Sequence, residues 1–154
     1  MRTIWRSIGN CAASALIDES GRFVWACAPR IDGDPFFCAL LGGTEPAEGM
    51  WAVEVEGLAK THQAYVRNTP VLRTELTDAL GASLEIIDFC PRFHQYGRTY
   101  RPLSFVRIIR PLAGAPRIRI RLRPMINYGE APATRTVGSN HIRFLCSDLT
   151  MRMT

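Results

Sequence analysis

Apolar and polar residues alternate along most of this chain with a period of two, the spacing that puts successive side chains on opposite faces of a β-strand. Trp51, Val53 and Val55 share one face of one such segment. The same period predicts strands at residues 13–18, 22–26, 71–76, 83–89, 104–110, 117–123 and 141–146. The pattern therefore predicts about eight strands in succession.

Turn-forming residues separate the predicted strands. Clusters of Asp, Gly, Ser and Pro occur at residues 18–21, 32–35 and 112–116, and such clusters are typical of tight turns. One short helix is predicted at residues 36–41, ended by Gly42 and Gly43. Because no helical period lies between the strands, the sequence predicts an all-β fold, an antiparallel two-sheet sandwich with at most one short helix. Residues 1–154 are expected to form a single domain.

Composition supports a folded protein of the cytoplasm. The chain has 154 residues, of which 47% are hydrophobic, enough for one domain with its own core. No apolar run approaches the roughly eighteen residues of a membrane span, and the N-terminus lacks the apolar segment of a signal peptide. The odd number of cysteines, without a Cys-x-x-Cys pair, predicts buried free thiols in a reducing compartment. They are Cys11, Cys27, Cys38, Cys90 and Cys146.

The net charge of +5 raises the question of a nucleic-acid partner. Arg117, Arg119, Arg121 and Arg123 share one face of a predicted strand, spaced about 6.6 Å apart. That stripe either binds phosphates, or is solvated or opposed by an acidic strand such as residues 54–56. No aromatic residue interleaves the arginines, which weighs against a platform for single-stranded nucleic acid. We therefore predict no nucleic-acid partner.

Two carboxylates, Asp32 and Asp34, invite comparison with a glycosidase. Glycoside hydrolysis needs an acid and a base about 5 to 10 Å apart. However, two Asp residues flanking Gly33 before Pro35 are what a tight turn selects. We predict no catalytic residue in this chain.

Metal and cofactor sites are not predicted either. The three histidines have no partners at metal-ligand spacing, no serine has a nucleophile-elbow context, and no glycine-rich phosphate loop occurs. The histidines are His62, His94 and His141.

Four ordered motifs resemble the opening of a known family. Residues 21–42 combine a Trp-containing strand, a Pro-Arg-x-Asp turn and a Phe-x-x-Leu-Leu-Gly segment. Ile-Asp-Phe-Cys-Pro at 87–91, the hairpin at 105–124 and Ile-Asn-Tyr-Gly at 126–129 follow. In this order and spacing, from residue 8 to 149, the chain resembles the N-terminal, trehalase-like domain of bacterial glycoside hydrolase family 15 proteins. Asn10, Ile31 and Asn127 replace residues common in that family.

This resemblance implies a large β-sandwich that precedes a helical (α/α) barrel, where the catalytic acid and base lie. The chain lacks such a barrel and is expected to be a truncated, non-catalytic N-terminal part of a larger glycoside hydrolase. Its role would be to pack on and support a barrel that hydrolyses an α-glucosidic bond with inversion. The barrel is then the main partner, and carbohydrate binds only through the full enzyme. The alternative is a free-standing module that binds carbohydrate or protein.

The same resemblance places Trp25, Arg30 and Asp32 at a substrate-pocket rim or at the domain interface. A guanidinium on the turn after the Trp25 strand suits a carboxylate or sugar hydroxyls. The alternatives are a local salt bridge that holds the turn and a tryptophan in the core. Trp5 and Trp51 are likewise either sugar platforms or core residues, and Trp5 alone has an irregular polar context.

A sandwich that stops partway leaves strand edges unpaired. The segment 147–154 still alternates at the end of the chain. We therefore expect open edges near residues 143–153 to pair with a second copy and form a homo-oligomer.

Overall fold

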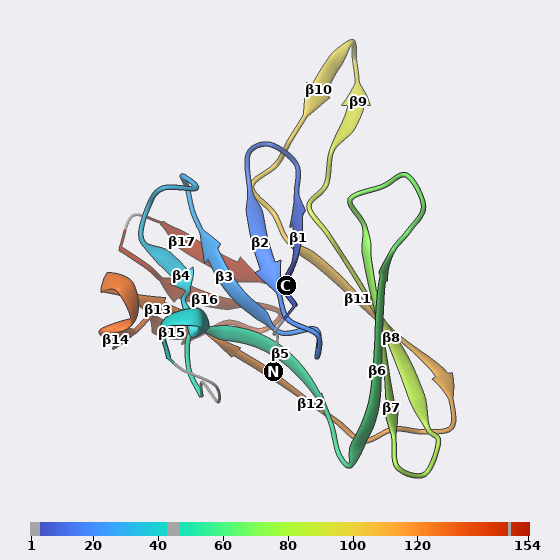
Figure 1. Cartoon of the computed structure of the whole chain (residues 1–154). Coiled ribbons are helices and arrows are strands. Elements are labelled where there is room, and N and C mark those ends of the chain that lie inside the picture. The colour runs from blue at the N-terminus through green and yellow to red at the C-terminus, as the bar shows by residue number, and fades with distance from the viewer. Residues whose placement is uncertain (1–3, 43–46, 148) are drawn as a thin grey trace.

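The computed structural model describes residues 4–42, 47–147 and 149–154 and shows an almost entirely β protein (Figure 1). All strand pairs in these residues are antiparallel. The predicted all-β antiparallel sandwich is confirmed. No helix in the same residues is long and apolar enough to cross a membrane.

Two sheets make up the body of the molecule. The first has the order β1-β2-β3-β5-β12, with β4 paired to β3. Its strands are β1 (Arg6–Gly9), β2 (Ser14–Ile17), β3 (Phe23–Cys27), β4 (Pro35–Phe37), β5 (Met50–Val55) and β12 (Ile118–Arg123). The second has the order β11-β8-β7-β6. Its strands are β6 (Leu58–Tyr65), β7 (Leu72–Asp78), β8 (Ser83–Phe89) and β11 (Val106–Ala113).

Smaller elements complete the fold. A three-stranded sheet has the order β15-β16-β17, and two hairpins are formed by β9 with β10 and by β13 with β14. The bounds are β9 (Phe93–Gln95), β10 (Arg98–Tyr100), β13 (Met125–Ile126), β14 (Ala131–Pro132), β15 (Thr134–Val137), β16 (Ile142–Leu145) and β17 (Thr150–Met153). Two 3-10 helices are η1 (Ala39–Leu41) and η2 (Asn127–Gly129). Because β16 is flanked on both sides, only β15 and β17 are edges of this sheet, and pairing between copies stays a prediction.

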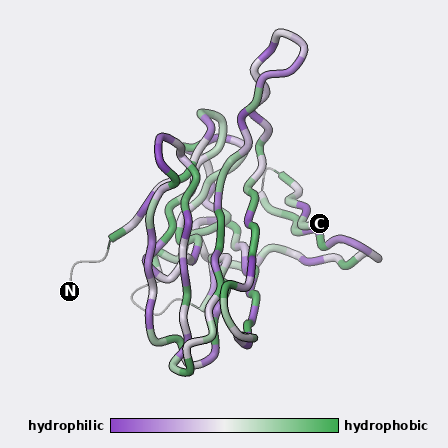
Figure 2. Tube along the Cα trace, turned by 90° about the vertical axis from the view of Figure 1, so that its right-hand side faces the viewer, coloured by the Kyte–Doolittle hydropathy of each residue, from purple (hydrophilic) through white to green (hydrophobic). Residues whose placement is uncertain are grey.

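The core lies between the two main sheets. Val53 and Val55 of β5 form one apolar cluster with Leu76 of β7 and with Leu84 and Ile86 of β8. The inward face predicted for the β5 segment is therefore confirmed, and Figure 2 shows how apolar and polar positions alternate along the strands. Burial of such side chains is the main favourable term in folding.

Phenylalanine rings build the second part of the core. Phe23 of β3 packs against Phe37, Trp51 and Phe105, with ring centroids 5.9, 5.2 and 5.9 Å away. Phe144 of β16 is buried in the same cluster, which attaches the three-stranded sheet to the sandwich. Aromatic pairs in this arrangement stabilise a core beyond the area that they bury.

The helix predicted at residues 36–41 is wrong for its first half. Phe36 and Phe37 belong to β4, where Phe37 pairs with Ala26 of β3, and only Ala39–Leu41 form a single 3-10 turn. The backbone N–H groups of Cys38 and Ala39 donate to the Gly49 carbonyl at 2.9 and 3.0 Å, which draws the segment away from an α-helix.

The cysteines are free thiols, as predicted, but they are not all buried. Cys27, Cys38 and Cys90 are buried and Cys146 is partly buried, whereas Cys11 is exposed in the β1–β2 turn. The prediction of burial is wrong for Cys11, because it occupies a left-handed turn position with φ 72° at the surface. Burial, assisted by the charge of Asp88, raises the pKa of Cys90 to about 12.

A buried ion pair lies on the second sheet, and its arginine also reaches the first sheet. Arg107 of β11 and Asp88 of β8 have side chains that are 1% and 0% exposed. Arg107 donates to both carboxylate oxygens at 2.7 and 2.9 Å, to the Trp51 carbonyl at 3.0 Å and to the Gly21 carbonyl at 2.6 Å. Its guanidinium carbon lies 4.5 Å from the ring centroid of Phe23. Burial raises the pKa of Asp88, and the neighbouring guanidinium opposes that shift.

We expect Arg107→Met to lower the free energy of unfolding by about 3 to 5 kcal/mol, because Asp88 keeps its burial and loses its partner. Urea unfolding at neutral pH measures this loss. The control is Arg110→Met on the same strand, where the side chain is exposed and a change within about 0.5 kcal/mol is expected. Equal losses in the two variants would contradict a special role for Arg107.

Candidate functional site

The turn between β3 and β4 presents an exposed ion pair. Arg30 donates from Nε and Nη2 to the two carboxylate oxygens of Asp32, at 2.8 and 2.7 Å. The two side chains are 77% and 63% exposed, and Ile31 between them is exposed as well. Hydrogen bonds from Arg30 hold the pKa of Asp32 below its ordinary value. The structure thus brings together two of the three residues predicted for this site.

Trp25 stands apart from that pair. It lies on β3 opposite Leu16 of β2 and is partly buried. Among the hydrogen bonds of residues 4–42, none joins Trp25 to Arg30 or Asp32. The three residues therefore do not form one polar cluster. They are related only by the chain that runs from β3 into the turn. Their role at a pocket rim or domain interface stays a prediction.

Asp34 ties the other end of this turn to distant parts of the chain. Its carboxylate accepts hydrogen bonds from the backbone N–H groups of Asn127 and Tyr128 and from the Ser147 hydroxyl, each at 2.7 Å. Burial opposes ionisation of Asp34, but these three donors outweigh it and hold the pKa below its ordinary value. Asp34 thus joins β4, η2 and the turn before β17.

The backbone of η2 is shaped to hold that carboxylate. Asn127, Tyr128 and Gly129 have φ of 53°, 55° and 92°, three left-handed residues in a row. Successive N–H groups in such a turn converge on an anion. A left-handed non-glycine residue costs on the order of 1 to 3 kcal/mol, and here the hydrogen bonds to Asp34 offset that cost. From the local sequence, Asp34 could only be interpreted as a turn residue. Its hydrogen-bond partners lie 93 or more residues away along the chain.

Asp34→Asn is expected to lower the free energy of unfolding at pH 7 by about 1 to 2 kcal/mol, because an amide cannot accept at both of its ends. The pKa of Asp34 is lowered in the folded state. Its contribution to the free energy of unfolding is therefore complete above the unfolded pKa, near 3.9, and is lost as the pH falls through the folded pKa. The difference between wild type and variant should therefore shrink below pH of about 4.

Urea titrations across that pH range measure this effect. The matched control is Asp32→Asn on the same turn, for which little change is expected because its one ion pair is exposed. A difference between wild type and Asp34→Asn that persists unchanged at low pH would contradict this role of the ionised Asp34 carboxylate.

Comparison with known proteins identifies the family of this chain. The family described as "Trehalase-like, N-terminal" matches residues 4–153, nearly the whole chain. The chain belongs to this family. The resemblance inferred from the four motifs is thereby confirmed.

A curated relative extends the comparison of this trehalase-like N-terminal domain. Trehalase 2 of Sulfolobus acidocaldarius is 29% identical over 122 residues. The match covers 79% of this chain and 18% of that relative, so the chain spans less than a fifth of its length. No solved structure matches.

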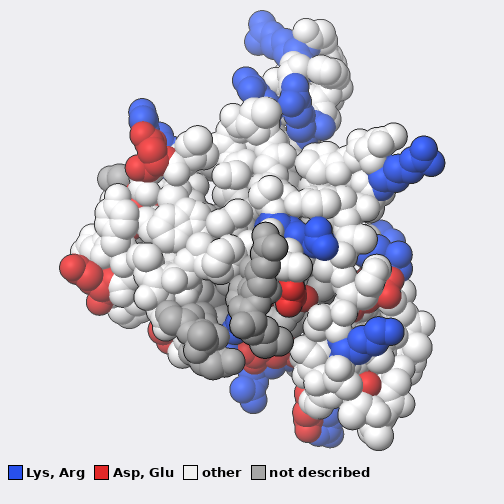
Figure 3. Space-filling model, in the orientation of Figure 1, with Lys and Arg blue, Asp and Glu red and all other residues white. Residues whose placement is uncertain are grey.

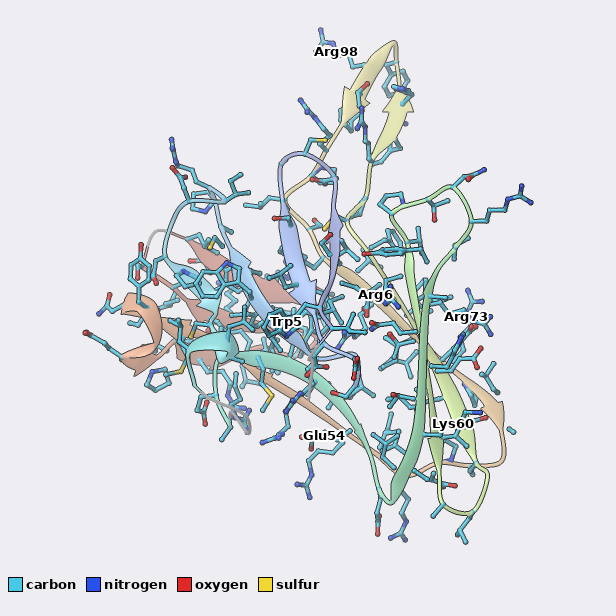
Figure 4. The ribbon with its side chains drawn as sticks, in the orientation of Figure 1. Trp5, Arg6, Glu54, Lys60, Arg73 and Arg98 are labelled. Carbon is cyan, nitrogen blue, oxygen red and sulfur yellow. The ribbon has the colours of Figure 1, made fainter. Side chains whose placement is uncertain are left out.

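The other tryptophans of the trehalase-like domain have different environments. Trp51 packs on Phe23 and lies 5.0 Å beneath the guanidinium carbon of Arg107, so it is a core residue. Trp5 is half-exposed near the N-terminus, as its irregular context indicated (Figure 4).

Two of the four arginines of the stripe at residues 117–123 have acidic partners. Arg121 Nε donates to Glu54 at 2.9 Å, and Arg117 Nη1 lies 3.8 Å from a carboxylate oxygen of Glu56. The cross-strand acidic partner that was one of two interpretations is therefore present. At Arg117 and Arg121, the positive charge is therefore paired with a carboxylate and is not free to bind phosphate.

The histidines of the domain lie on separate elements. His62 is on β6, His94 on β9 and His141 just before β16. Within residues 4–42, 47–147 and 149–154, no group of three His, Cys, Asp or Glu side chains has the geometry of a metal site.

Proposed function

We propose that this domain is the non-catalytic front part of a glycoside hydrolase that packs on and supports a helical barrel. The barrel hydrolyses an α-glucosidic bond with inversion, and trehalose is the first substrate to test. The carrying observation is that a trehalase-like N-terminal domain accounts for 18% of a relative named as a trehalase. The catalytic carboxylates then lie in the remaining part of such a protein.

The geometry of the β3–β4 turn supports this role. Asp34 braces one end of the turn through three hydrogen bonds, and Arg30 and Asp32 neutralise each other at its tip. A braced, neutral and exposed turn presents Ile31 for an apolar contact without the cost of burying an unpaired charge. Such a surface suits a permanent domain interface better than a phosphate-binding one.

We also propose that the protein works in the cytoplasm. All five cysteines are free thiols, including Cys11 at the surface. An exposed thiol and buried unpaired cysteines fit a reducing compartment.

The isolated chain is expected to hydrolyse neither trehalose nor maltooligosaccharides, while the full-length gene product releases glucose from one of them. A coupled glucose assay on both proteins measures this difference. Glucose release by the isolated chain that disappears in Asp32→Asn would overturn the proposal. Sugar binding by the isolated chain in calorimetry, with an inactive full-length product, would instead favour a free-standing carbohydrate-binding module.

Arg30→Ala should have little effect on urea unfolding of the isolated chain, because the ion pair is exposed. In the full-length enzyme we expect kcat/KM to fall roughly tenfold, because the turn positions the barrel surface near its substrate. The control is Arg117→Ala, an exposed residue near the β7–β8 turn at the opposite end of the molecule, which should leave kcat/KM unchanged. A kcat/KM equal to that of the wild type in the Arg30→Ala enzyme would contradict the role of this turn at the domain interface.

A further inference from the structure

The β9–β10 hairpin projects from the body of the molecule as a narrow arm. Residues 92–101, which we name the arm, are all exposed, and Figures 1 and 2 show the arm standing clear of both main sheets. Tyr100 pairs with Phe93 at its base, and Tyr96 and Gly97 form the tip with φ of 51° and 68°. Two left-handed residues between antiparallel strands form the tight turn typical of hairpins.

The arm carries only positive charge. Between Asp88 and Glu130 the sequence has no acidic residue, and Arg92, Arg98 and Arg101 lie on the arm. None of these three forms an ion pair with another residue described by the structure. On the face drawn in Figure 3, acidic and basic side chains mix over the body, whereas the arm carries basic ones alone. Arg98 extends from the arm into solvent (Figure 4).

Exposed aromatic rings accompany these arginines. Phe93 and Tyr100 stack with centroids 5.4 Å apart and an interplanar angle of 13°, and Tyr96 at the tip is 86% exposed. An isolated two-stranded hairpin is at best marginally stable in water. Arginine, tyrosine and phenylalanine are enriched in the buried centres of protein interfaces, where lysine and acidic residues are depleted. The arm thus has the composition of an interface and no partner surface within the described chain.

We propose that the β9–β10 arm docks on an acidic protein surface, which, on the function proposed above, belongs to the helical part of the same protein. The guanidinium groups pair with surface carboxylates, and the exposed face of Tyr96 packs between them. The arm points to the same end of the molecule as the β3–β4 turn (Figure 1). It is also held to the β1–β2 turn there, where Arg92 Nη1 lies 3.6 Å from Cys11 Sγ. One partner surface can therefore cover the arm and the turn together.

Nucleic acid fits the arm less well. Three guanidinium groups neutralise about three phosphates, which gives weak binding at physiological salt. Phe93 and Tyr100 stack on each other, so each ring has lost one face to the other and is less available to a base.

Backbone amide hydrogen exchange tests the proposal, comparing the isolated chain with the full-length protein. We expect exchange at residues 93–100 to slow about tenfold or more in the full-length protein. The β7–β8 turn at residues 79–81, at the opposite end of the molecule, is the internal control and should not change. Arg98→Glu combined with Arg101→Glu should abolish the slowing. Arg119→Glu on β12, which reverses an exposed arginine on the body, should preserve it.

The outcomes separate this proposal from the proposed function. Equal exchange of the arm in both proteins overturns the docking arm, even when the full-length protein hydrolyses trehalose. Slowed exchange that the double variant abolishes supports the arm, even when no glycoside is hydrolysed and the proposed function fails. Slowing that oligo-uridylate induces in the isolated chain, with none in the full-length protein, assigns the arm to nucleic acid and overturns the proposal.

Discussion

The structure depends most on one buried guanidinium. Arg107 lies between the two main sheets, where its N–H groups reach Asp88, the Trp51 carbonyl and the Gly21 carbonyl. A charge in that position is tolerated only when every donor has an acceptor, because its desolvation costs several kcal/mol. These acceptors lie on β8, on β5 and in the turn before β3. The sheets therefore have one relative position that satisfies Arg107, and a small shift leaves a buried charge without its partners.

A sandwich held in this way can present irregular segments at its ends. Loops between strands are more mobile than the strands, and function concentrates there when the scaffold is rigid. Asp34 does near the surface what Arg107 does in the core, since one charged group gathers hydrogen-bond partners from separate segments, here η2 and the turn before β17. The difference is burial: Arg107 lies in the core, whereas Asp34 is only partly buried.

The sequence predicted strands wherever one face is buried. β5 and β8 were predictable because Val53, Val55, Leu84 and Ile86 recur every second residue on a face that packs inward. β6 was missed because nearly all of its side chains are exposed on both faces, so no period appears. β4 was taken for a helix because Pro35, Phe36 and Phe37 are all buried, which leaves no alternation.

In the candidate site too, contacts between sequence neighbours could be predicted and contacts between distant segments could not. The contact of Arg30 with Asp32 was predictable, because the two residues are neighbours on one turn. The roles of Asp34 and Arg107 were not, because each depends on groups brought from distant strands. Single arginines in an arginine-rich chain carry no signal of burial. Whether an arginine is paired within the fold nevertheless decides how the net charge of +5 should be interpreted. Arg107 and Arg121 are neutralised within the fold, whereas the arginines of the β9–β10 arm form no ion pair with another described residue.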